Sequence, residues 1–298
     1  MICRECPRRC GQERGEMSGA GFCGQGLRPR VARAALHLWE EPCISGRRGS
    51  GAIFFSGCTL KCVFCQNTEI SHGGKGIVIT AARLAEIMRE LEEQGAETIN
   101  LVTPGHFADA IQEALSLYRP GVPVVYNTSG YESPNILAAM EGLVDIYLPD
   151  LKTMSAGMAG RLFRASDYPE TATRAILEMV RQTGQPVYDE AGIMQRGTLI
   201  RHLVLPGMTT DSLQVLNWIY ENCPGIPVSL MGQYVPCGEA ASVPGLGRRL
   251  KPREYERVQA HMRALGIPGY CQTEGADDCA FIPSFDGTGV ERMGVKDV

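Results

Sequence analysis

The chain has 298 residues, which is enough for one large hydrophobic core with a small attachment. Its formal net charge is -4, with charges of both signs mixed along the sequence, which argues against nucleic acid or an anionic membrane surface as a partner. No apolar run approaches the roughly 20 residues that cross a bilayer, and the chain opens with Cys3, Arg4 and Cys6 instead of an apolar signal segment. We therefore expect a cytoplasmic protein.

Seven of the 12 cysteines fall into two groups with short spacings. The groups are Cys3, Cys6, Cys10 and Cys23, followed by Cys58, Cys62 and Cys65. Closely spaced cysteines are typical of metal ligands in a reducing compartment, whereas disulfides are typical of secreted chains. The other five cysteines are scattered, and we interpret them as small buried side chains or incidental thiols.

Residues 1–27 are rich in glycine and contain almost no aliphatic side chains, so they cannot form a core by themselves. The spacing Cys3-x-x-Cys6, followed by Cys10 and Cys23 with a glycine after each, predicts a four-cysteine metal knuckle. Zinc would give a closed structural site, whereas a second iron–sulfur cluster would relay electrons or anchor a substrate. The need to fold a coreless segment favours zinc. We interpret residues 31–51 as a connector, so that residues 1–51 form one unit.

From residue 52 onward, short apolar strands alternate with amphipathic helices. Strands are expected at residues 52–55, 99–102, 122–126, 144–148, 199–205 and 227–231. Helices are expected at residues 82–94, 108–118, 134–141, 171–183 and 210–222. Such alternation predicts an α/β fold whose parallel sheet is covered by helices on its outer face.

Polar residues at the strand ends favour a curved sheet over an open one. They are Cys58, Thr103, Asn127, Asp150, Arg201, His202 and Gln233. A barrel brings such residues together at one mouth, whereas an open sheet spreads them out. We therefore predict a partial (β/α)6 TIM-like barrel over residues 52–235. Residues 236–298 are expected to add a surface helix at 251–265 and a segment, 266–298, that caps the open edges or the mouth.

The loop at residues 57–67, GCTLKCVFCQN, directly follows the first predicted strand of the barrel. It presents three thiols, and a cube of four irons has one corner per ligand. Three cysteines therefore leave one iron open for chemistry. A structural zinc site is the alternative, but three cysteines are one short of a closed tetrahedral site.

The spacing of Cys58, Cys62 and Cys65, with Phe64 before the last cysteine, resembles the signature of the radical S-adenosylmethionine (SAM) superfamily. The resemblance implies that the open iron binds the amino and carboxylate groups of SAM, and that the surroundings of Phe64 lie against the adenine. It further implies one-electron cleavage of SAM to a 5′-deoxyadenosyl radical, which abstracts hydrogen from a substrate. A low-potential flavodoxin or ferredoxin is implied as the electron donor.

Within this superfamily the chain resembles the activating-enzyme branch typified by the pyruvate formate-lyase activating enzyme, and above all its uncharacterised homologues. The likeness runs from about residue 53 to residue 235 and includes Asn67 after the third cysteine. The run Asp150-Leu151-Lys152 resembles the aspartate-x-lysine element that holds the methionine end of the cofactor. Residues 200–207 resemble the fifth strand, which ends in proline and glycine.

The chain departs from that branch after two strands. The stretch Thr103-Pro104-Gly105-His106 stands where the branch has Gly-Gly-Glu for the SAM amino group, which makes Pro104, Gly105 and a neutral His106 positional candidates. Asn127-Thr128-Ser129-Gly130 replaces an aspartate followed by Thr-Asn-Gly. The pocket is expected to be lined by Asn127, Ser129, Arg201 and Gln233.

The leading hypothesis is thus a radical SAM enzyme, an oxidoreductase that resembles the pyruvate formate-lyase activating enzyme. Its reaction would be the installation of a glycyl radical on a partner protein. Hydrogen abstraction from a small molecule or from another protein residue is the alternative within the same class. An iron–sulfur or zinc protein used only for binding or electron transfer is the rival from another class, and the open iron argues against it.

Overall fold

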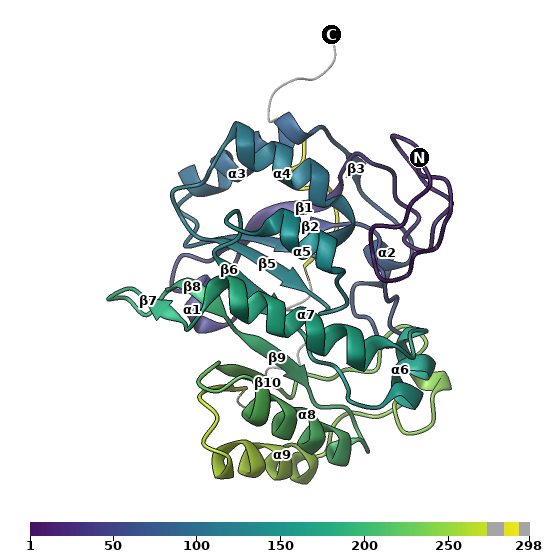
Figure 1. Cartoon of the computed structure of the whole chain (residues 1–298), viewed down its shortest axis with the longest axis vertical. Helices are drawn as coiled ribbons and strands as arrows, with labels where there is room; N and C mark the ends of the chain where they lie inside the picture. Colours follow the sequence, from purple (N-terminus) through teal and green to yellow (C-terminus); the bar gives the residue numbers. More distant parts are fainter. Residues whose placement is uncertain (273–282, 292–298) are drawn as a thin grey trace.

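Figure 1 shows the computed structural model of the chain, which describes residues 1–272 and 283–291. The strands are β1 (Arg30–His37), β2 (Ser50–Phe55), β3 (Ile77–Val78), β4 (Ile99–Val102), β5 (Val124–Thr128), β6 (Ile146–Pro149), β7 (Val187–Tyr188), β8 (Met194–Thr198), β9 (Ile200–Leu203), β10 (Val228–Met231) and β11 (Gly269–Cys271). The helices are α1 (Pro42–Ser45), α2 (Thr68–Ser71), α3 (Ala81–Glu93), α4 (Ala108–Leu117), α5 (Pro134–Met140), α6 (Ala156–Phe163), α7 (Tyr168–Thr183), α8 (Thr209–Asn222) and α9 (Pro252–Ala264), with the 3-10 turns η1 (Gly105–Phe107) and η2 (Ala240–Ser242).

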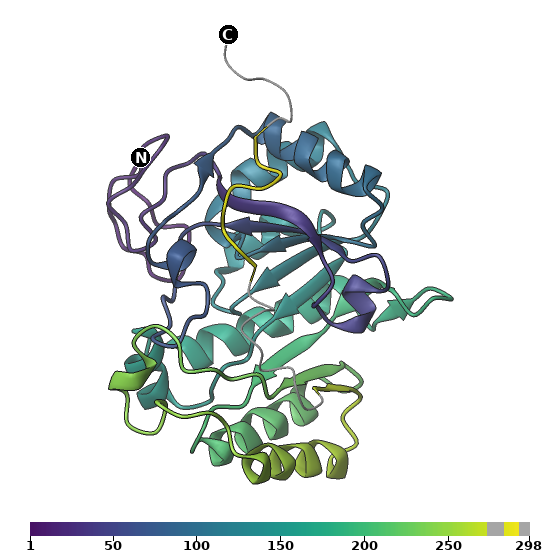
Figure 2. The same ribbon diagram turned by 180° about the vertical axis from the view of Figure 1, so that it is seen from behind.

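The parallel strands lie in two adjoining sheets, one of eight strands and one of three, that are covered by helices. β2, β4, β5 and β6 pair in parallel in that order, and β8 pairs with the far side of β6. β9 follows β8 almost directly and continues in parallel to β10 and β11. A bridge between Asp150 and Arg201 joins the end of β6 to β9. Helices α3, α4, α5, α7 and α8 lie on the outer face, which confirms the predicted α/β fold (Figures 1 and 2).

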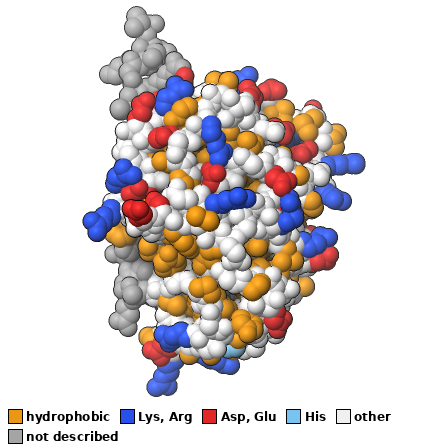
Figure 3. Space-filling model, turned by 60° about the vertical axis from the view of Figure 1, so that its left-hand side comes forward, with side chains coloured by type: hydrophobic (Ala, Val, Ile, Leu, Met, Phe, Trp, Pro, Cys, Tyr) orange, Lys and Arg blue, Asp and Glu red, His pale blue; other side chains and the backbone are white. Residues whose placement is uncertain are grey.

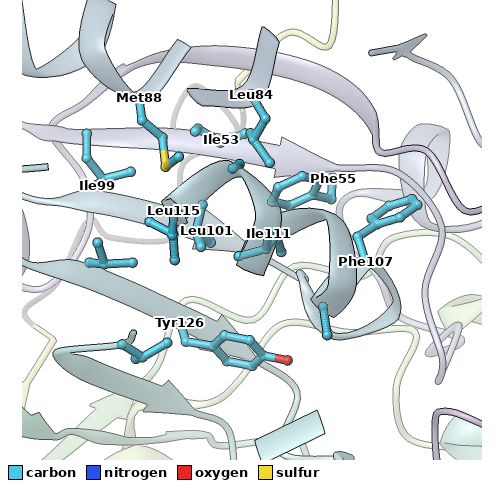
Figure 4. Close-up of a cluster of buried hydrophobic side chains, with 14 of the residues drawn as sticks. Ile53, Phe55, Leu84, Met88, Ile99, Leu101, Phe107, Ile111, Leu115 and Tyr126 are labelled. Atoms are coloured by element: carbon cyan, nitrogen blue, oxygen red, sulfur yellow. The ribbon is translucent and has the colours of Figure 1, made fainter. Parts of the chain in front are cut away.

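The main core lies between the helices and the outer face of the sheet. Ile53 and Leu101 of the sheet pack with Leu84 of α3 and Ile111 of α4 (Figure 4). Side chains alternate between the two faces of a strand, so every second residue of β2 and β4 enters this core. Each such fully buried aliphatic side chain contributes about 1.5–3 kcal/mol. Helix α3 begins where predicted because the Thr80 side chain accepts a hydrogen bond from the backbone of the first turn.

The predicted elements of the barrel are present, with ends that differ by a few residues. The largest difference is at α7, which begins at Tyr168 instead of residue 171. Pro169 lies in the first turn of this helix, where a missing backbone N–H costs nothing. The sequence analysis placed the start of this helix three residues too late, because it began the helix after Pro169 although the first turn accommodates a proline.

The interpretation of residues 31–51 as a connector is wrong. Strand β1 pairs antiparallel with β2 and extends the sheet beyond the parallel strands. Helix α1 buries Cys43 and Ile44 against inward-facing side chains of β5 and β6. The sequence did not predict this strand because its buried residues are mostly alanines, which have low β-propensity. Its pairing with β2 is in addition a tertiary contact, which a local pattern does not encode.

The described part of the C-terminal tail, residues 283–291, lies along the first two strands (Figure 2). The backbone N–H of Ala34 in β1 donates to the carbonyl of Thr288 at 2.8 Å. The ring of Phe285 packs edge-on against Phe54 of β2, with 5.6 Å between ring centroids. Phe54 faces away from α3 and α4, so the tail covers the inner face of the sheet at this edge.

The rest of the predicted capping segment is only partly described. Strand β11 extends the sheet beside β10, whereas residues 273–282 and 292–298 lie outside the described residues. Helix α9 exposes most of its surface, as predicted, and buries Val258 and Met262.

Basic and acidic side chains are interspersed on the face of the molecule that Figure 3 shows. This arrangement agrees with the mixed charges along the sequence. Within residues 1–272 and 283–291, no helix has both the length and the apolar character needed to cross a membrane.

Candidate active site

The three-cysteine loop, residues 57–67, is fixed on both sides by backbone hydrogen bonds. The N–H of Gly57 donates to the carbonyl of Ile70 at 2.9 Å, which closes the loop on α2. The N–H of Val63 donates to Leu162 of α6 at 3.0 Å, and its carbonyl accepts from Glu239 at 2.8 Å. The loop is therefore clamped between α6 and the segment after β10, which restricts the positions of its thiols.

The three thiols lie in an environment that suits sulfur ligands. Cys58 Sγ accepts from the N–H of Leu60 at 3.4 Å, and Cys65 Sγ accepts from the hydroxyl of Ser71 at 3.3 Å. Burial raises the pKa of the Cys62 thiol, and the positive charge of Lys152 partly offsets this effect. Donors and a nearby cation stabilise electron-rich sulfur, so the loop fits an anionic cluster bound through thiolates.

Asn67, at the end of this loop, supplies further support for a bound group. Its side-chain oxygen is buried, and among the described residues it has no hydrogen-bond partner. A buried acceptor that lacks a partner costs about 1–3 kcal/mol. The position is therefore compatible with a ligand that donates a hydrogen bond.

Three residues predicted from the strand ends form one hydrogen-bonded network with Lys152, which the family resemblance singled out. Arg201 Nε donates to Asp150 Oδ1 at 2.9 Å, and Arg201 Nη2 donates to Asn127 Oδ1 at 2.6 Å. Lys152 Nζ donates to the other carboxylate oxygen of Asp150. The ends of β5 and β6 and the start of β9 thus bring Asn127, Asp150 and Arg201 together, and Lys152 joins them through Asp150.

Opposite charges in this network favour the ionised form of each group. Burial raises the pKa of the Asp150 carboxyl, but the positive charges of Arg201 and Lys152 outweigh it, so the pKa lies below its usual value. Burial lowers the pKa of Lys152, and the negative charge of Asp150 more than compensates. All three groups are therefore charged at neutral pH, which gives the site two cations and one anion.

Sequence analysis missed Glu40, which joins the network from the segment between β1 and α1. Its Oε2 lies 3.6 Å from Arg201 Nη1. Burial raises the pKa of the Glu40 carboxyl, and the charge of Arg201 opposes this shift. No local pattern marks this residue, since only the insertion of α1 into the inner face of the sheet brings it near Arg201.

The structure gives Pro104, Gly105 and His106 mainly structural contacts. Pro104 is the N-cap of η1. His106 is buried, its Nε2 lies 2.8 Å from the Ser56 carbonyl, and burial lowers its pKa to about 4. The neutral ring thus donates Nε2–H to Ser56, so this nitrogen is not free to accept a bond from SAM. A Cβ on Gly105 would lie 2.4 Å from a carboxylate oxygen of Glu132, so a larger residue here would displace that side chain.

Thr103, just before these residues, has a φ of +60°, which is unusual for a β-branched side chain. Its N–H donates to the carbonyl of Asn127 at 2.8 Å. Lys61, inside the three-cysteine loop, also has a positive φ of 49°. Strained backbone of this kind concentrates at functional sites, where the surrounding structure holds it in place.

Phe64 and Gln233, two further predicted residues, contact neighbouring side chains. The Phe64 ring packs against Phe163 and Tyr234, at centroid distances of 5.9 and 6.0 Å. Gln233 Oε1 accepts from the side chain of Gln272 at 2.8 Å.

Ser129 is tied to the neighbouring strand end through Tyr168. The Tyr168 hydroxyl lies 2.9 Å from the Ser129 carbonyl and 2.8 Å from the Asp150 carbonyl. The same hydroxyl accepts from the N–H of Lys152 at 2.9 Å. This one buried tyrosine therefore braces the ends of β5 and β6.

His202, beside Arg201, points toward α8 and serves the fold. Its Nδ1 lies 2.7 Å from the Leu151 carbonyl, and its Nε2 lies 2.9 Å from the Ser212 hydroxyl. Burial lowers its pKa from 6.5 to about 4, so the ring is neutral. Nδ1–H therefore donates to Leu151, and Nε2 accepts from Ser212.

We expect this histidine to make the fold sensitive to acid. A depressed pKa contributes stability that is present above 6.5 and is lost as the pH falls toward 4, by about 3 kcal/mol in total. Urea unfolding at a series of pH values measures this effect. Between pH 6.5 and pH 4, the free energy of unfolding should fall less in His202→Gln than in the wild type. His261→Gln, on the surface helix α9, is the matched control and should retain the wild-type loss. If acid lowered the free energy of unfolding equally in all three proteins, His202 would not be the source of the acid sensitivity.

The four N-terminal cysteines line one hollow, next to Arg8, Arg14 and His106. Within the described part of the chain, no three or more Cys, His, Asp or Glu side chains are grouped closely enough to hold a single metal ion. The predicted four-cysteine metal knuckle, with zinc or a second cluster, is therefore not confirmed.

A sequence profile of the radical SAM superfamily matches residues 52–219, which is more than half of the chain. The chain belongs to the radical SAM superfamily. The cofactors of this radical SAM enzyme are a 4Fe–4S cluster and SAM. An uncharacterised protein from Methanocaldococcus jannaschii is 28% identical over 266 residues, which cover 86% of this chain and 72% of that protein.

Solved structures share the fold at low identity. Methylornithine synthase matches with a TM-score of 0.51 and 14% identity over 89% of this chain and 74% of that one. A radical SAM methyltransferase from Sphaerobacter thermophilus matches with a TM-score of 0.50 and 14% identity over 76% and 68%. SuiB from Streptococcus suis, bound to the precursor peptide SuiA, matches with a TM-score of 0.50 and 11% identity. That match covers 74% of this chain and only 47% of SuiB.

Proposed function

We propose that Cys58, Cys62 and Cys65 hold the 4Fe–4S cluster and that SAM binds beside them at the mouth of the partial barrel. The main support is the placement of three clamped thiols on one loop, with the cationic side chain of Lys152 near Cys62. A cluster held by these three cysteines would supply one-electron reductive cleavage of SAM and, through it, the capacity to abstract hydrogen from a substrate.

The network at the strand ends would hold the methionine end of SAM. Lys152 is the proposed partner of the SAM carboxylate, and Asp150 orients Lys152 while Arg201 secures Asp150. Asn67 offers a buried acceptor on the loop itself. Phe64 is the proposed aromatic contact of the adenine, and Asn127, Ser129 and Gln233 are proposed to line the pocket. Charge-assisted hydrogen bonds in a buried site are stronger than those in water.

Replacing Lys152 with methionine tests this assignment. We expect SAM to bind about 10–100-fold more weakly, because a charge-assisted hydrogen bond contributes about 1.5–3 kcal/mol. Anaerobic calorimetry on reconstituted protein measures the change. Lys75→Met, which removes an exposed lysine paired with Glu69, is the matched control and should bind SAM normally. Unaltered affinity in Lys152→Met would exclude Lys152 as the carboxylate partner.

For the substrate, we propose the installation of a glycyl radical on a partner protein. The cluster loop and the run Asp150-Leu151-Lys152 support this reaction through their likeness to the activating-enzyme branch. Residues 103–106 lack the Gly-Gly-Glu element of that branch, which favours a second candidate. That candidate is hydrogen abstraction from a small molecule or another protein residue. In either case the proposed electron donor is a low-potential flavodoxin or ferredoxin.

Two measurements test the reaction. Anaerobically reconstituted protein, mixed with dithionite and SAM, should release 5′-deoxyadenosine. Its complete absence would favour a role in binding or electron transfer alone. Electron paramagnetic resonance of co-purified proteins should then show a glycyl radical, whereas 5′-deoxyadenosine release without such a signal would favour the second candidate.

A further inference from the structure

The segment between β1 and α1 places two adjacent glutamates, Glu40 and Glu41, inside the barrel. Helix α1, which follows them, lies at the opposite end of the sheet from α2 (Figure 1). Its Cys43 and Ile44 pack against inward-facing side chains of β5 and β6, so α1 plugs that end of the barrel. The Glu40 carboxylate reaches Arg201 on the inner face of β9. The two glutamates therefore lie between the plug and the network at the strand ends.

Unpartnered polar atoms are concentrated at this place. Among the described residues, five buried side-chain atoms have no hydrogen-bond partner, and three of them belong to Glu41 and Asn100. Asn100 is fully buried in β4, and its neighbours Ile99 and Leu101 belong to the outer core. Because side chains alternate along a strand, Asn100 points into the barrel. Buried polar atoms almost always have partners, so these three atoms indicate a group that binds here.

Backbone pairing and a side-chain hydrogen bond hold Asn100 close to α1. Thr98 Oγ1 donates to the Ile44 carbonyl at 3.1 Å, which ties α1 to β4 two residues before Asn100. Asn100 also pairs in register with Val125 of β5, and Val125 packs with Ile44. Asn100 and the glutamates that precede α1 therefore face the same part of the interior.

The two carboxyl groups and the Asn100 amide influence one another. Burial raises the pKa of the Glu40 carboxyl, and the charge of Arg201 opposes this shift. The side chains of Asn100 and Glu41 lower the same pKa, which agrees with their position beside Glu40. Burial raises the pKa of Glu41 as well, and Arg201 again opposes the shift. Glu40, Glu41 and Asn100 thus form one group of side chains, here called the interior acidic site.

Positive charge in the barrel is insufficient for its carboxyl groups. Arg201 Nη1 lies 3.6 Å from Glu40 Oε2, and Arg201 Nε donates to Asp150 at 2.9 Å. Lys152 also pairs with Asp150. Together with Glu41, three carboxyl groups share these two cations, and the proposed binding of the SAM carboxylate would occupy Lys152. Buried carboxylates need a compensating charge, so the interior acidic site suits one further cation.

The walls of the interior next to this site are apolar and open. Val102 of β4, Leu203 of β9 and Met231 of β10 are partly exposed, whereas the outward-facing Leu101 and Leu230 are fully buried. Alternation along the strands points the partly exposed side chains into the barrel. An apolar wall beside carboxylates fits a cation that is carried on an alkyl chain.

We propose that Glu40, Glu41 and Asn100 bind the ammonium group of an alkylamine substrate. Glu41 Oε2 and Asn100 Oδ1 accept from the ammonium N–H groups, and Glu40 supplies a second carboxylate. The alkyl chain then extends along the apolar wall toward the mouth. This inference rests on the proposed function for the position of SAM at that mouth, and it favours the second candidate reaction. The substrate class is a primary alkylamine, either free or as the side chain of a lysine in a protein.

Calorimetry with n-butylamine, which is protonated at pH 7.5, tests the proposal on the anaerobically reconstituted full chain without SAM. We expect saturable binding, and n-butanol, a neutral molecule of the same size, should bind about tenfold more weakly or not at all. Glu41→Gln should weaken n-butylamine binding by about 10–100-fold and abolish the preference over n-butanol. Glu170→Gln, which changes an exposed carboxylate on α7, is the control and should bind as the wild type does.

The preference for the cation separates binding from a structural role, because a glutamate that only stabilises the fold would not set it. No saturable binding by the wild type, equal affinities for the two ligands, or unaltered affinity in Glu41→Gln would overturn the proposal.

Asn100→Ala covers the case in which Glu41→Gln does not fold. The Asn100 amide has no hydrogen-bond partner among the described residues, so its removal breaks no native hydrogen bond. We expect this variant to fold, as circular dichroism would show, and to bind n-butylamine about 3–10-fold more weakly. Wild-type affinity in folded Asn100→Ala protein would count against the proposal.

A peptide distinguishes the two sources of the amine. If Gly-Gly-Lys-Gly-Gly, blocked at both ends, binds more tightly than n-butylamine, the substrate is a lysine of a protein, whereas the reverse order identifies a free amine. The calorimetry needs no SAM cleavage. Binding that depends on Glu41, without release of 5′-deoxyadenosine on addition of SAM and dithionite, would uphold this inference and reject the proposed function. Release of 5′-deoxyadenosine by a protein that binds no amine would do the opposite.

Discussion

Replacing Cys62 with alanine is expected to abolish 5′-deoxyadenosine formation and to remove about four irons per chain. Cys62 is the most deeply buried of the three loop cysteines, and burial raises the pKa of its free thiol, so iron binding must compensate for the cost of a buried thiolate. Mutating a group that only supports a metal ligand lowers metal affinity or activity by about 10–100-fold. Loss of a ligand itself should lower them by more than that. The measurements are iron analysis and chromatography of the nucleoside product under anaerobic conditions.

Cys223→Ala is the matched control for this experiment. Cys223 is also buried, and burial raises the pKa of its thiol as well. It lies at the end of α8, outside both cysteine groups. The control should retain its iron and its product yield, so that a loss in Cys62→Ala reports on the cluster and not on packing. A Cys62→Ala protein with normal turnover would refute the proposed site.

Replacing Arg201 with methionine is expected to give the largest loss of stability. Arg201 contacts Asn127, Asp150 and Glu40, which come from three different parts of the chain. Without it, two buried carboxylates lose a cation, and breaking a buried ion pair costs about 3–5 kcal/mol. Chemical denaturation at pH 7.5 measures the change. Arg201→Lys should recover little of it, because an ammonium group cannot bridge three partners as a planar guanidinium does.

Arg181→Met provides the comparison. Arg181 also pairs with two carboxylates, Glu141 and Glu178, but these groups are exposed. Solvent screens such pairs, so the transition midpoint of Arg181→Met should stay close to that of the wild type. If both variants unfolded at the same denaturant concentration, the buried network would not be the stabilising element that its contacts indicate. Weaker SAM binding by folded Arg201→Met protein would link the network to the cofactor.

Local patterns in the sequence were sufficient for most of the barrel. The apolar spacing in α3 and the Thr80 cap lie within a few residues of one another, so they predict the helix without tertiary information. The same holds for the strand that ends before Asp150. The convergence of Asn127, Asp150 and Arg201 followed from a topological rule, since parallel strands present their ends at one mouth.

Residues that act through long-range contacts could not be predicted in this way. Glu40 meets Arg201 only because α1 packs into the inner face of the sheet. Glu132 occupies the space beside Gly105, and His106 turns to the Ser56 carbonyl instead of serving as a free acceptor. Each of these contacts joins segments far apart in the chain, and no periodicity within either segment encodes it.

The sequence by itself determined the family of this protein, because a three-cysteine spacing is a local property that sets how many irons of a cluster can receive a cysteine ligand. It also indicated the α/β class, because strand and helix periods are local. Only the tertiary structure decided how the four N-terminal cysteines are arranged around a shared hollow beside Gly57. Spacing along a chain limits which ligands can meet, whereas the placement of these four cysteines around one cavity depends on how residues 1–27 pack.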